Sequence, residues 1–341
     1  MIRILLMTLL ITASGPLWAA FDHSHAAWTA LLQKHVVPVR EGHGTRVDYR
    51  AFQQDEAALE AYLNQLSEVS QATFDSWNRD RRLAFLINAY NAFTVKLILT
   101  AYPDLDSIRD LGGFLSSPWD KRFFTLLGKE RSLDEVEHGL IRPNFDEPRI
   151  HVAVNCASIG CPALRTEAYV GDRLDAQLED ALVTFLSDPQ RNRYNRESGE
   201  LEVSSIFDWY GDDFDSPALN LDGIEDLFAR YAELLTDSPQ GRAAIQDQSA
   251  DIEFLDYNWK LNDLATYSGP TAQARVWQHR HKPVGWAEPA KPNMSRRNQV
   301  VGLPASAQPT ATRAVVTQLR FDNPTTPPEH PTHNTTLALK E

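Results

Sequence analysis

The segment from Glu137 to Pro162 carries most of the residues that could do covalent chemistry. It contains both cysteines of the chain, Cys156 and Cys161. A strand expected over residues 149–156 ends at Cys156 and is followed by a turn, a position where a rigid base exposes a reactive side chain. A thiol there becomes a nucleophile when a neighbouring histidine lowers its pKa. The pattern therefore predicts a cysteine nucleophile at Cys156.

Two histidines are candidate partners of this thiol. His151 is close in sequence, but residues five apart on a regular strand face opposite sides and lie about 16 Å apart. It could act only if the strand bulges or ends early, and otherwise it is a hydrogen-bonded structural residue. His138 lies on a helix predicted over residues 132–141, and Asp134 precedes it by one turn on the same face. The spacing favours His138 as the base, with Asp134 or Glu137 orienting its imidazole.

Two cysteines in an oxidising compartment can instead pair with each other. A Cys156–Cys161 disulfide would close a loop of about six residues, would stabilise the fold by about 2 kcal/mol in the chain-entropy model, and would remove the nucleophile. Inert buried thiols are the third alternative. Cys-x4-Cys with a distant histidine is not a usual zinc spacing, so we expect no metal and no other cofactor.

Amide and aromatic side chains are the candidates for binding a substrate. Asn88 and Asn91 share one face of a predicted buried helix. They either tie neighbouring loops to the core or position a substrate carbonyl. Trp119, Trp209 and Tyr210 could line a groove for a sugar or a peptide, because aromatic rings bury a large area. Packing in the core is the alternative for each ring.

These residues must be positioned by several helices and a few strands. Helices with apolar residues at helical spacing are predicted over residues 21–37, 53–66, 80–101, 132–141, 173–186 and 222–235. The predicted strands cover residues 149–156, 201–206 and 250–255. A capping box of Ser132 and Glu135 starts the helix that carries His138. The elements predict an α/β (α+β) fold, a single mixed domain with several helices around a small sheet.

The N-terminus has the pattern of a secretory signal peptide over residues 1–20. Arg3 precedes an apolar run, and the small residues Ala19 and Ala20 offer a cleavage site. We therefore expect a periplasmic or secreted protein, in a compartment where disulfides form. No later segment is expected to span a membrane.

The C-terminal residues 268–341 differ in composition from the rest of the chain. They contain half of its 20 prolines and show no apolar periodicity, so we predict a mostly disordered tail after a globular domain over residues 21–267. The whole chain has a net charge of −13. This acidity argues against a nucleic-acid partner, which requires a basic surface.

Several strings resemble the family catalogued as domain of unknown function 547. They include RLAFLINAYNAFTVKLIL, SLDEVEHGLIRP, EPRIHVAVNCASIGCPALR, IFDWYGDDF and FLDYNWKLN, and the resemblance covers roughly residues 25–265. It implies a secreted α/β domain in which Glu137, His138, His151 and Cys156 form a Cys–His–acid site similar to those of papain-like or transglutaminase-like hydrolases. Cys161 belongs to the bacterial version of the motif, which favours Cys156 as the nucleophile.

The leading hypothesis is therefore a periplasmic or secreted enzyme with a Cys156–His138–acid site. Its reaction would be acyl transfer or amide hydrolysis on an envelope peptide or a peptidoglycan-like substrate. The alternative is a non-catalytic module that binds an envelope polysaccharide or a protein and is stapled by a Cys156–Cys161 disulfide.

Overall fold

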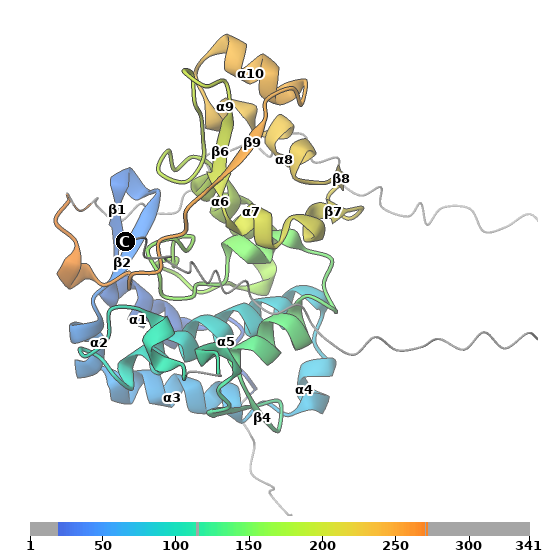
Figure 1. The fold of residues 1–341 in the computed structure, drawn as a ribbon. Helices are drawn as coiled ribbons and strands as arrows, with labels where there is room; N and C mark the ends of the chain where they lie inside the picture. Colours follow the sequence, from blue (N-terminus) through green and yellow to red (C-terminus); the bar gives the residue numbers. More distant parts are fainter. Residues whose placement is uncertain (1–19, 114–115, 270, 272–341) are drawn as a thin grey trace, which may run out of the picture. The chain divides into compact units, whose positions relative to one another are not determined.

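The computed structural model describes residues 20–113, 116–269 and 271 (Figure 1). The predicted signal peptide before Ala20 and almost all of the predicted tail lie outside these residues. The α-helices are α1 (Ala26–His35), α2 (Tyr49–Gln54), α3 (Glu56–Ser67), α4 (Gln71–Asp75), α5 (Arg79–Leu99), α6 (Leu174–Leu186), α7 (Ile206–Trp209), α8 (Ile224–Arg230), α9 (Ala232–Leu235) and α10 (Pro239–Gln246).

The strands are short and form small separate sheets. They are β1 (Val36–Val39), β2 (Gly44–Val47), β3 (Phe124–Leu126), β4 (Lys129–Arg131), β5 (Arg193–Tyr194), β6 (Leu201–Ser204), β7 (Asp215–Ser216), β8 (Leu221–Asp222) and β9 (Ile252–Leu255). Antiparallel pairs join β1 to β2, β3 to β4 and β7 to β8, whereas β6 lies between antiparallel β5 and parallel β9. Helices with small sheets confirm the predicted α+β class.

Short helical segments connect these elements. They are η1 (Arg40–Gly42), η2 (Ile108–Leu111), η3 (Pro118–Asp120), η4 (Glu135–Ile141), η5 (Pro148–Val152), η6 (Gly171–Arg173), η7 (Gly211–Phe214) and η8 (Leu264–Thr266). All of them are 3₁₀ turns except η4, which is a π-helix.

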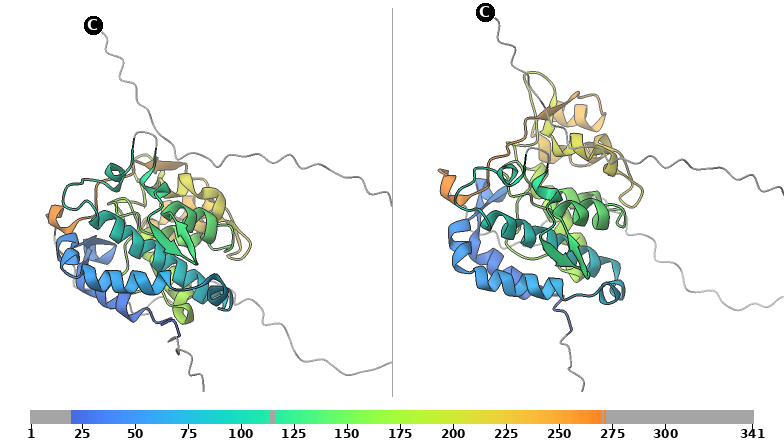
Figure 2. Two further views of the ribbon diagram at one scale, coloured as in Figure 1. Left: turned by 90° about the horizontal axis from the view of Figure 1, so that it is seen from below. Right: turned by 60° about the horizontal axis from the view of Figure 1, so that its bottom comes forward.

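Helix α5 is the centre of one hydrophobic core. The side chain of Asn78 caps its first turn by accepting a hydrogen bond from the Arg81 amide. Its length and hydropathy would suit a membrane span, but 89% of the relevant window is buried inside the protein, as in the core helix of a globular domain. Helices α3 and η4 pack against it, and Figure 2 shows α3 and α5 side by side.

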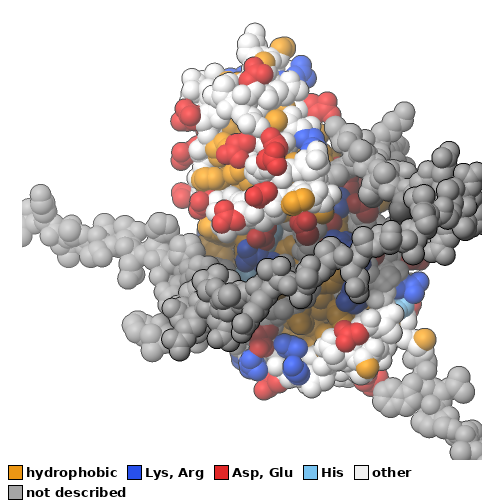
Figure 3. Space-filling model, turned by 90° about the vertical axis from the view of Figure 1, so that its right-hand side faces the viewer, with side chains coloured by type: hydrophobic (Ala, Val, Ile, Leu, Met, Phe, Trp, Pro, Cys, Tyr) orange, Lys and Arg blue, Asp and Glu red, His pale blue; other side chains and the backbone are white. Residues whose placement is uncertain are grey.

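A second hydrophobic core forms around α6, β6 and α8. Its largest buried side chains include Phe185, Phe207 and Phe228. The predicted strands at residues 201–206 and 250–255 are confirmed as β6 and β9. On the face shown in Figure 3, acidic side chains gather over the upper part, where Figure 1 places α8 and α10. This surface agrees with the acidic composition of the chain.

The strand predicted over residues 149–156 is wrong. Pro148 starts the 3₁₀ turn η5, and the chain after Val152 is irregular. Proline suits the first position of a helical turn, because its missing amide has no partner to lose there. Residues 148–152 are all buried. A short apolar run buried on every side gives no periodicity that would separate a strand from a helical turn.

The helix predicted over residues 132–141 is confirmed, and so is its capping box. Ser132 Oγ accepts from the Glu135 amide, and the Glu135 carboxylate accepts from the Ser132 amide, at 3.2 and 3.1 Å. The helix then widens into η4, in which the Arg142 amide reaches back to the Glu137 carbonyl at 2.9 Å. Such π-helical turns are rare and occur frequently at functional sites.

Candidate functional site

The cysteine loop, residues 155–162, holds both cysteines in one disulfide between Cys156 and Cys161. Cys156 is half-buried and Cys161 is 3% exposed. The Tyr257 hydroxyl lies over the bond, 3.3 Å from the Cys156 sulfur and 3.2 Å from the Cys161 sulfur. In this state the predicted nucleophile is not a free thiol, and the disulfide alternative of the sequence analysis is the form observed.

A buried arginine fixes the second half of the cysteine loop. Arg191 donates to the carbonyls of Ile159 and Cys161, at 2.7 and 2.6 Å, and more weakly to that of Gly160. Its charge is balanced by buried Asp188. Burial lowers the pKa of Arg191 to about 10, against the attraction of Asp188. The Arg191 guanidinium therefore provides hydrogen-bond donors to three consecutive carbonyls of the loop.

Glycine at position 160 is explained by space. Gly160 does not have a positive φ; within this loop Ala157 has one, at 63°. A Cβ at residue 160 would lie 2.8 Å from the ring of Tyr257. The glycine thus lets Tyr257 approach the disulfide.

Asn88 and Asn91 use their amides on the backbone. Asn88 donates to the carbonyl of Tyr169 and accepts from its amide, at 2.7 and 3.0 Å. Asn91 donates to the carbonyl of Ala153 and accepts from the amide of Asn155, at 3.0 and 2.8 Å. These are the contacts of the structural alternative, in which the amides tie loops to the core, and a role in substrate binding remains a prediction.

Charged and aromatic side chains form a second group, the carboxylate–histidine cluster. Its members are Tyr90, Asp134, Glu137, His138, Arg142, His151, Tyr210 and Asp213. They come from α5, the helix that ends in η4, η5, and the segment from α7 to η7. The structure thus brings together all four of the predicted acid and histidine residues.

Asp213 is the acceptor at one edge of the cluster. Arg142 donates to both of its oxygens at 2.7 Å, and His151 Nε2 donates to one of them at 2.7 Å. Burial opposes the ionisation of Asp213, but these hydrogen bonds outweigh it and hold its pKa well below the usual range. Arg142 also donates to His138 Nδ1 at 3.0 Å, so this nitrogen must be unprotonated.

His151 is 1% exposed and stacks on Tyr210, with ring centroids 3.9 Å apart. Burial lowers its pKa, although Asp213 and Glu137 act in the opposite direction. A neutral ring that donates from Nε2 carries its lone pair on Nδ1. Nδ1 has no hydrogen-bond partner among the described residues and lies 4.0 Å from Glu137 Oε1. His151 therefore presents a proton acceptor to Glu137.

Glu137 lies at the centre of the cluster. Burial raises the pKa of Tyr90 and that of Tyr210, and the nearby Glu137 carboxylate raises both further. His138 Nε2 lies 4.0 Å from Glu137 Oε1 and 3.7 Å from Asp134 Oδ1. Both acids that were predicted to orient His138 are thus within electrostatic reach of it.

Four partly exposed rings form a continuous surface, the aromatic wall. Trp259 is its centre, with ring centroids 4.6 Å from Tyr257, 5.7 Å from Trp209 and 5.9 Å from Trp119. Trp209 and Tyr257 also touch, at 4.8 Å. Of the rings predicted to line a groove, Trp119 and Trp209 belong to this wall, whereas Tyr210 belongs to the carboxylate–histidine cluster.

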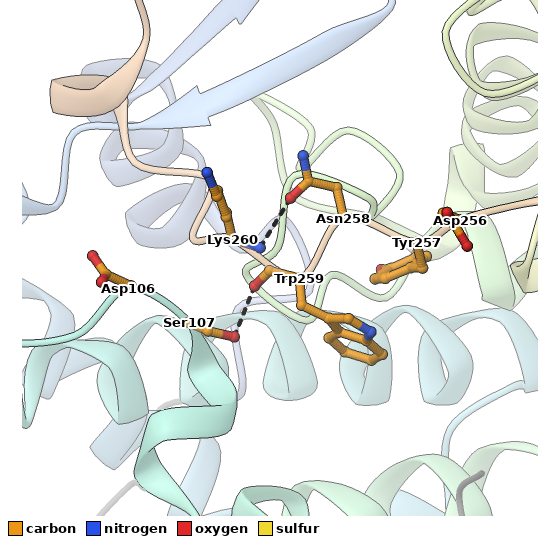
Figure 4. A pocket seen from close by; sticks show the side chains of 7 residues that line it. All are labelled: Asp106, Ser107, Asp256, Tyr257, Asn258, Trp259 and Lys260. Carbon is orange, nitrogen blue, oxygen red and sulfur yellow. Dashed lines mark hydrogen bonds between the residues drawn. The ribbon is translucent and has the colours of Figure 1, made fainter. Parts of the chain in front are cut away.

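An open pocket of about 540 Å³ lies beside the wall. Figure 4 shows Tyr257 and Trp259 on its lining, together with polar side chains of the segments 106–107 and 256–260. The Ser107 hydroxyl donates to the Trp259 carbonyl at 2.7 Å and so ties the two segments together. Arg109 stacks over the Trp259 ring, with its guanidinium carbon 5.3 Å from the centroid.

Sequence reasoning missed several residues of the site. Tyr90, Arg142, Asp213, Tyr257 and Trp259 received no role, although Arg142 lies one turn after His138 on the helix. Asp213 lies 62 residues after His151, so no local spacing could have joined them.

Comparison with known protein families matches part of the chain. Residues 74–186, about a third of the chain, match the family described as protein of unknown function, DUF547. No curated protein and no solved structure gives a significant match. The matched segment includes Glu137, His138, His151 and both cysteines, but it ends before Tyr210 and Asp213. Over residues 74–186 the chain resembles the DUF547 family, whose description assigns it no function.

Proposed function

We propose that this chain is a periplasmic or secreted module that binds envelope polysaccharide on the aromatic wall. The observation that carries the proposal is the contact of four partly exposed rings along one surface. Aromatic faces pack on the apolar faces of sugar rings and lose little side-chain freedom in doing so. The polar lining of the adjoining pocket offers hydrogen bonds to sugar hydroxyls.

Two further observations support the location and the ligand class. The signal-peptide pattern and the disulfide fit an oxidising compartment outside the cytoplasm. The net charge of −13 disfavours an anionic nucleic acid. The bracing of the cysteine loop holds Tyr257 in place, and a rigid wall loses less entropy when it binds a ligand.

The test is co-sedimentation of the protein with purified peptidoglycan sacculi. We expect Trp209→Ala and Trp259→Ala each to weaken binding at least about tenfold, as for a central aromatic contact. Phe254→Ala is the matched control, because this ring is 37% exposed and is not part of the wall. Equal binding by all of these variants and the parent protein would refute the proposal.

A second candidate is the thiol enzyme of the sequence analysis, acting by acyl transfer or amide hydrolysis on an envelope peptide. It requires prior reduction of the disulfide. The different burial of the two sulfurs favours it, since reduction would expose Cys156 more than Cys161. After reduction, an alkylating agent should modify Cys156 first, with an apparent pKa below about 8.5 that rises in His138→Ala. Equal slow labelling of both thiols would refute the thiol-enzyme hypothesis.

A further inference from the structure

Two carboxylates of unequal burial lie together in the carboxylate–histidine cluster. The Glu137 side chain is 8% exposed, whereas that of Asp134 is 36% exposed. His138 Nε2 lies 4.0 Å from Glu137 Oε1 and 3.7 Å from Asp134 Oδ1, so these two oxygens are at most 7.7 Å apart. Both residues belong to the helical segment that widens into a π-helix.

An independent feature shows that this is more than an acidic surface. His151 is almost completely buried, and its Nδ1 has no hydrogen-bond partner among the described residues. Its other nitrogen is fixed by Asp213, so the unpaired lone pair faces Glu137 across 4.0 Å. An unpaired buried polar atom calls for an explanation, and a proton acceptor that faces a carboxylate fits a site of proton transfer.

The carboxylates are linked to the aromatic wall through Tyr210. This residue follows Trp209 of the wall in the chain, and its ring stacks on that of His151, with ring centroids 3.9 Å apart. His151 Nδ1 in turn lies 4.0 Å from Glu137 Oε1. A polymer that lies along the wall therefore passes close to the cluster.

We propose that Glu137 and Asp134 form an acid–base pair that hydrolyses a glycosidic bond of a polysaccharide held on the wall, without a thiol. This inference rests on the proposed binding function. Two carboxyl groups that flank the bond are the usual requirement for glycoside hydrolysis, and a limit of 7.7 Å permits both the retaining and the inverting separations.

In the inverting form of the reaction, Glu137 gives its proton to the glycosidic oxygen while the bond from that oxygen to the anomeric carbon breaks. Asp134 takes a proton from a water molecule whose oxygen bonds to the same carbon. The products are two sugar hydroxyl groups, and the carboxyls recover their starting states by proton exchange with solvent. We assign the acid to Glu137, which faces the unpaired Nδ1 of His151, and the base to Asp134, whose greater exposure gives it access to water.

The experiment uses the full chain with purified peptidoglycan sacculi and measures bound protein and new reducing ends in the same tubes. We expect Glu137→Gln and Asp134→Asn each to lower the release of reducing ends at least about 100-fold, the size of a general acid–base contribution. Binding should stay within twofold of the parent protein. Asp208→Asn is the control, because this exposed acid lies beside Trp209 and outside the pair.

A parent protein that binds sacculi but releases no reducing ends would overturn the inference and leave the binding function intact. Full release by Glu137→Gln would also overturn it. If the parent protein does not bind, the proposed function fails and this inference fails with it. Circular dichroism of each variant separates a lost reaction from a lost fold.

Discussion

The cysteine loop and the carboxylate–histidine cluster differ in how their buried polar groups are paired by hydrogen bonds. In the loop, Arg191, Asn91 and Asn155 supply partners to the backbone of the turn. In the cluster, the buried Nδ1 of His151 has no hydrogen-bond partner among the described residues. Full pairing makes a region rigid, whereas an unpaired proton acceptor beside a carboxylate leaves room for a proton to move. This difference fits a structural role for the loop, and it is one basis on which we propose a reaction at the cluster.

Removal of Arg191 should have the largest effect on stability, because the loop depends on it. Arg191→Ala leaves the Asp188 carboxylate buried with fewer partners and strips donors from the carbonyls of residues 159–161. We expect a loss of about 3–5 kcal/mol in the free energy of unfolding, measured by urea denaturation. Arg196→Ala, which breaks the exposed pair with Asp237, is the control and should change it by about 1 kcal/mol or less. Similar values for both variants would mean that the loop is not braced by Arg191.

Asn91 is hydrogen bonded to the other end of the same loop, at Asn155. Asn91→Ala leaves the carbonyl of Ala153 and the amide of Asn155 unpaired in a buried site. We expect a loss of about 2–4 kcal/mol in the free energy of unfolding, from two unsatisfied groups. Asn64→Ala is the matched control on the exposed face of α3 and should be nearly neutral. A small effect at residue 91 would instead favour a role for this amide in binding a substrate.

The disulfide should contribute less to the free energy of unfolding than the hydrogen bonds that Arg191 and Asn91 make to the loop. No thiol should titrate in the native protein before reduction, because both cysteines are in the bond. The double variant Cys156→Ser with Cys161→Ser should lose about 2 kcal/mol of unfolding free energy, the value for a loop of this size. Its circular dichroism should remain that of the parent protein. Two reactive thiols in freshly purified native protein would contradict this account of the loop.

Of these two regions only the cluster should respond to pH, because the cysteine loop holds no group that titrates. The pKa of His151 is lowered from 6.5 and that of Asp213 from 3.8 on folding. The unfolded chain therefore binds more protons, and stability falls as the pH drops below about 6.5 for His151 and below about 4 for Asp213. Urea denaturation at pH 7 and pH 5 should show a smaller loss in His151→Gln than in the parent protein. An equal loss in both proteins would show that the pKa of His151 is the same in the folded and the unfolded chain.

Local patterns in the sequence were sufficient to predict much of the fold. Helices α3, α5 and α6 follow their apolar periodicity, and the capping box of Ser132 and Glu135 is decided within four residues. The predicted strand at residues 149–156 failed because its side chains are buried on all sides, which erases the periodicity. The argument from strand geometry against His151 as the partner of Cys156 is therefore wrong as well.

The site was less predictable, because its contacts join distant segments. The cluster takes Glu137 from one helix and Asp213 from a turn 76 positions later, a distance that no motif spacing records. The pairing of Cys156 with Cys161 stayed open in the sequence, since a disulfide depends on compartment and geometry as well as spacing. The two cysteines pointed to a loop with a structural role, whereas the candidate centre consists of the acids and histidines of the cluster.

The central claim is that the chemistry of this site comes from the carboxylates and does not need the cysteines. One assay tests it directly: the release of reducing ends from purified sacculi by the parent protein, by Glu137→Gln, and by the double variant Cys156→Ser with Cys161→Ser. The account predicts that the double cysteine variant keeps release within about threefold of the parent protein, whereas Glu137→Gln loses at least about 100-fold. Full activity in Glu137→Gln together with its loss in the cysteine variant would contradict the account and return the chemistry to Cys156.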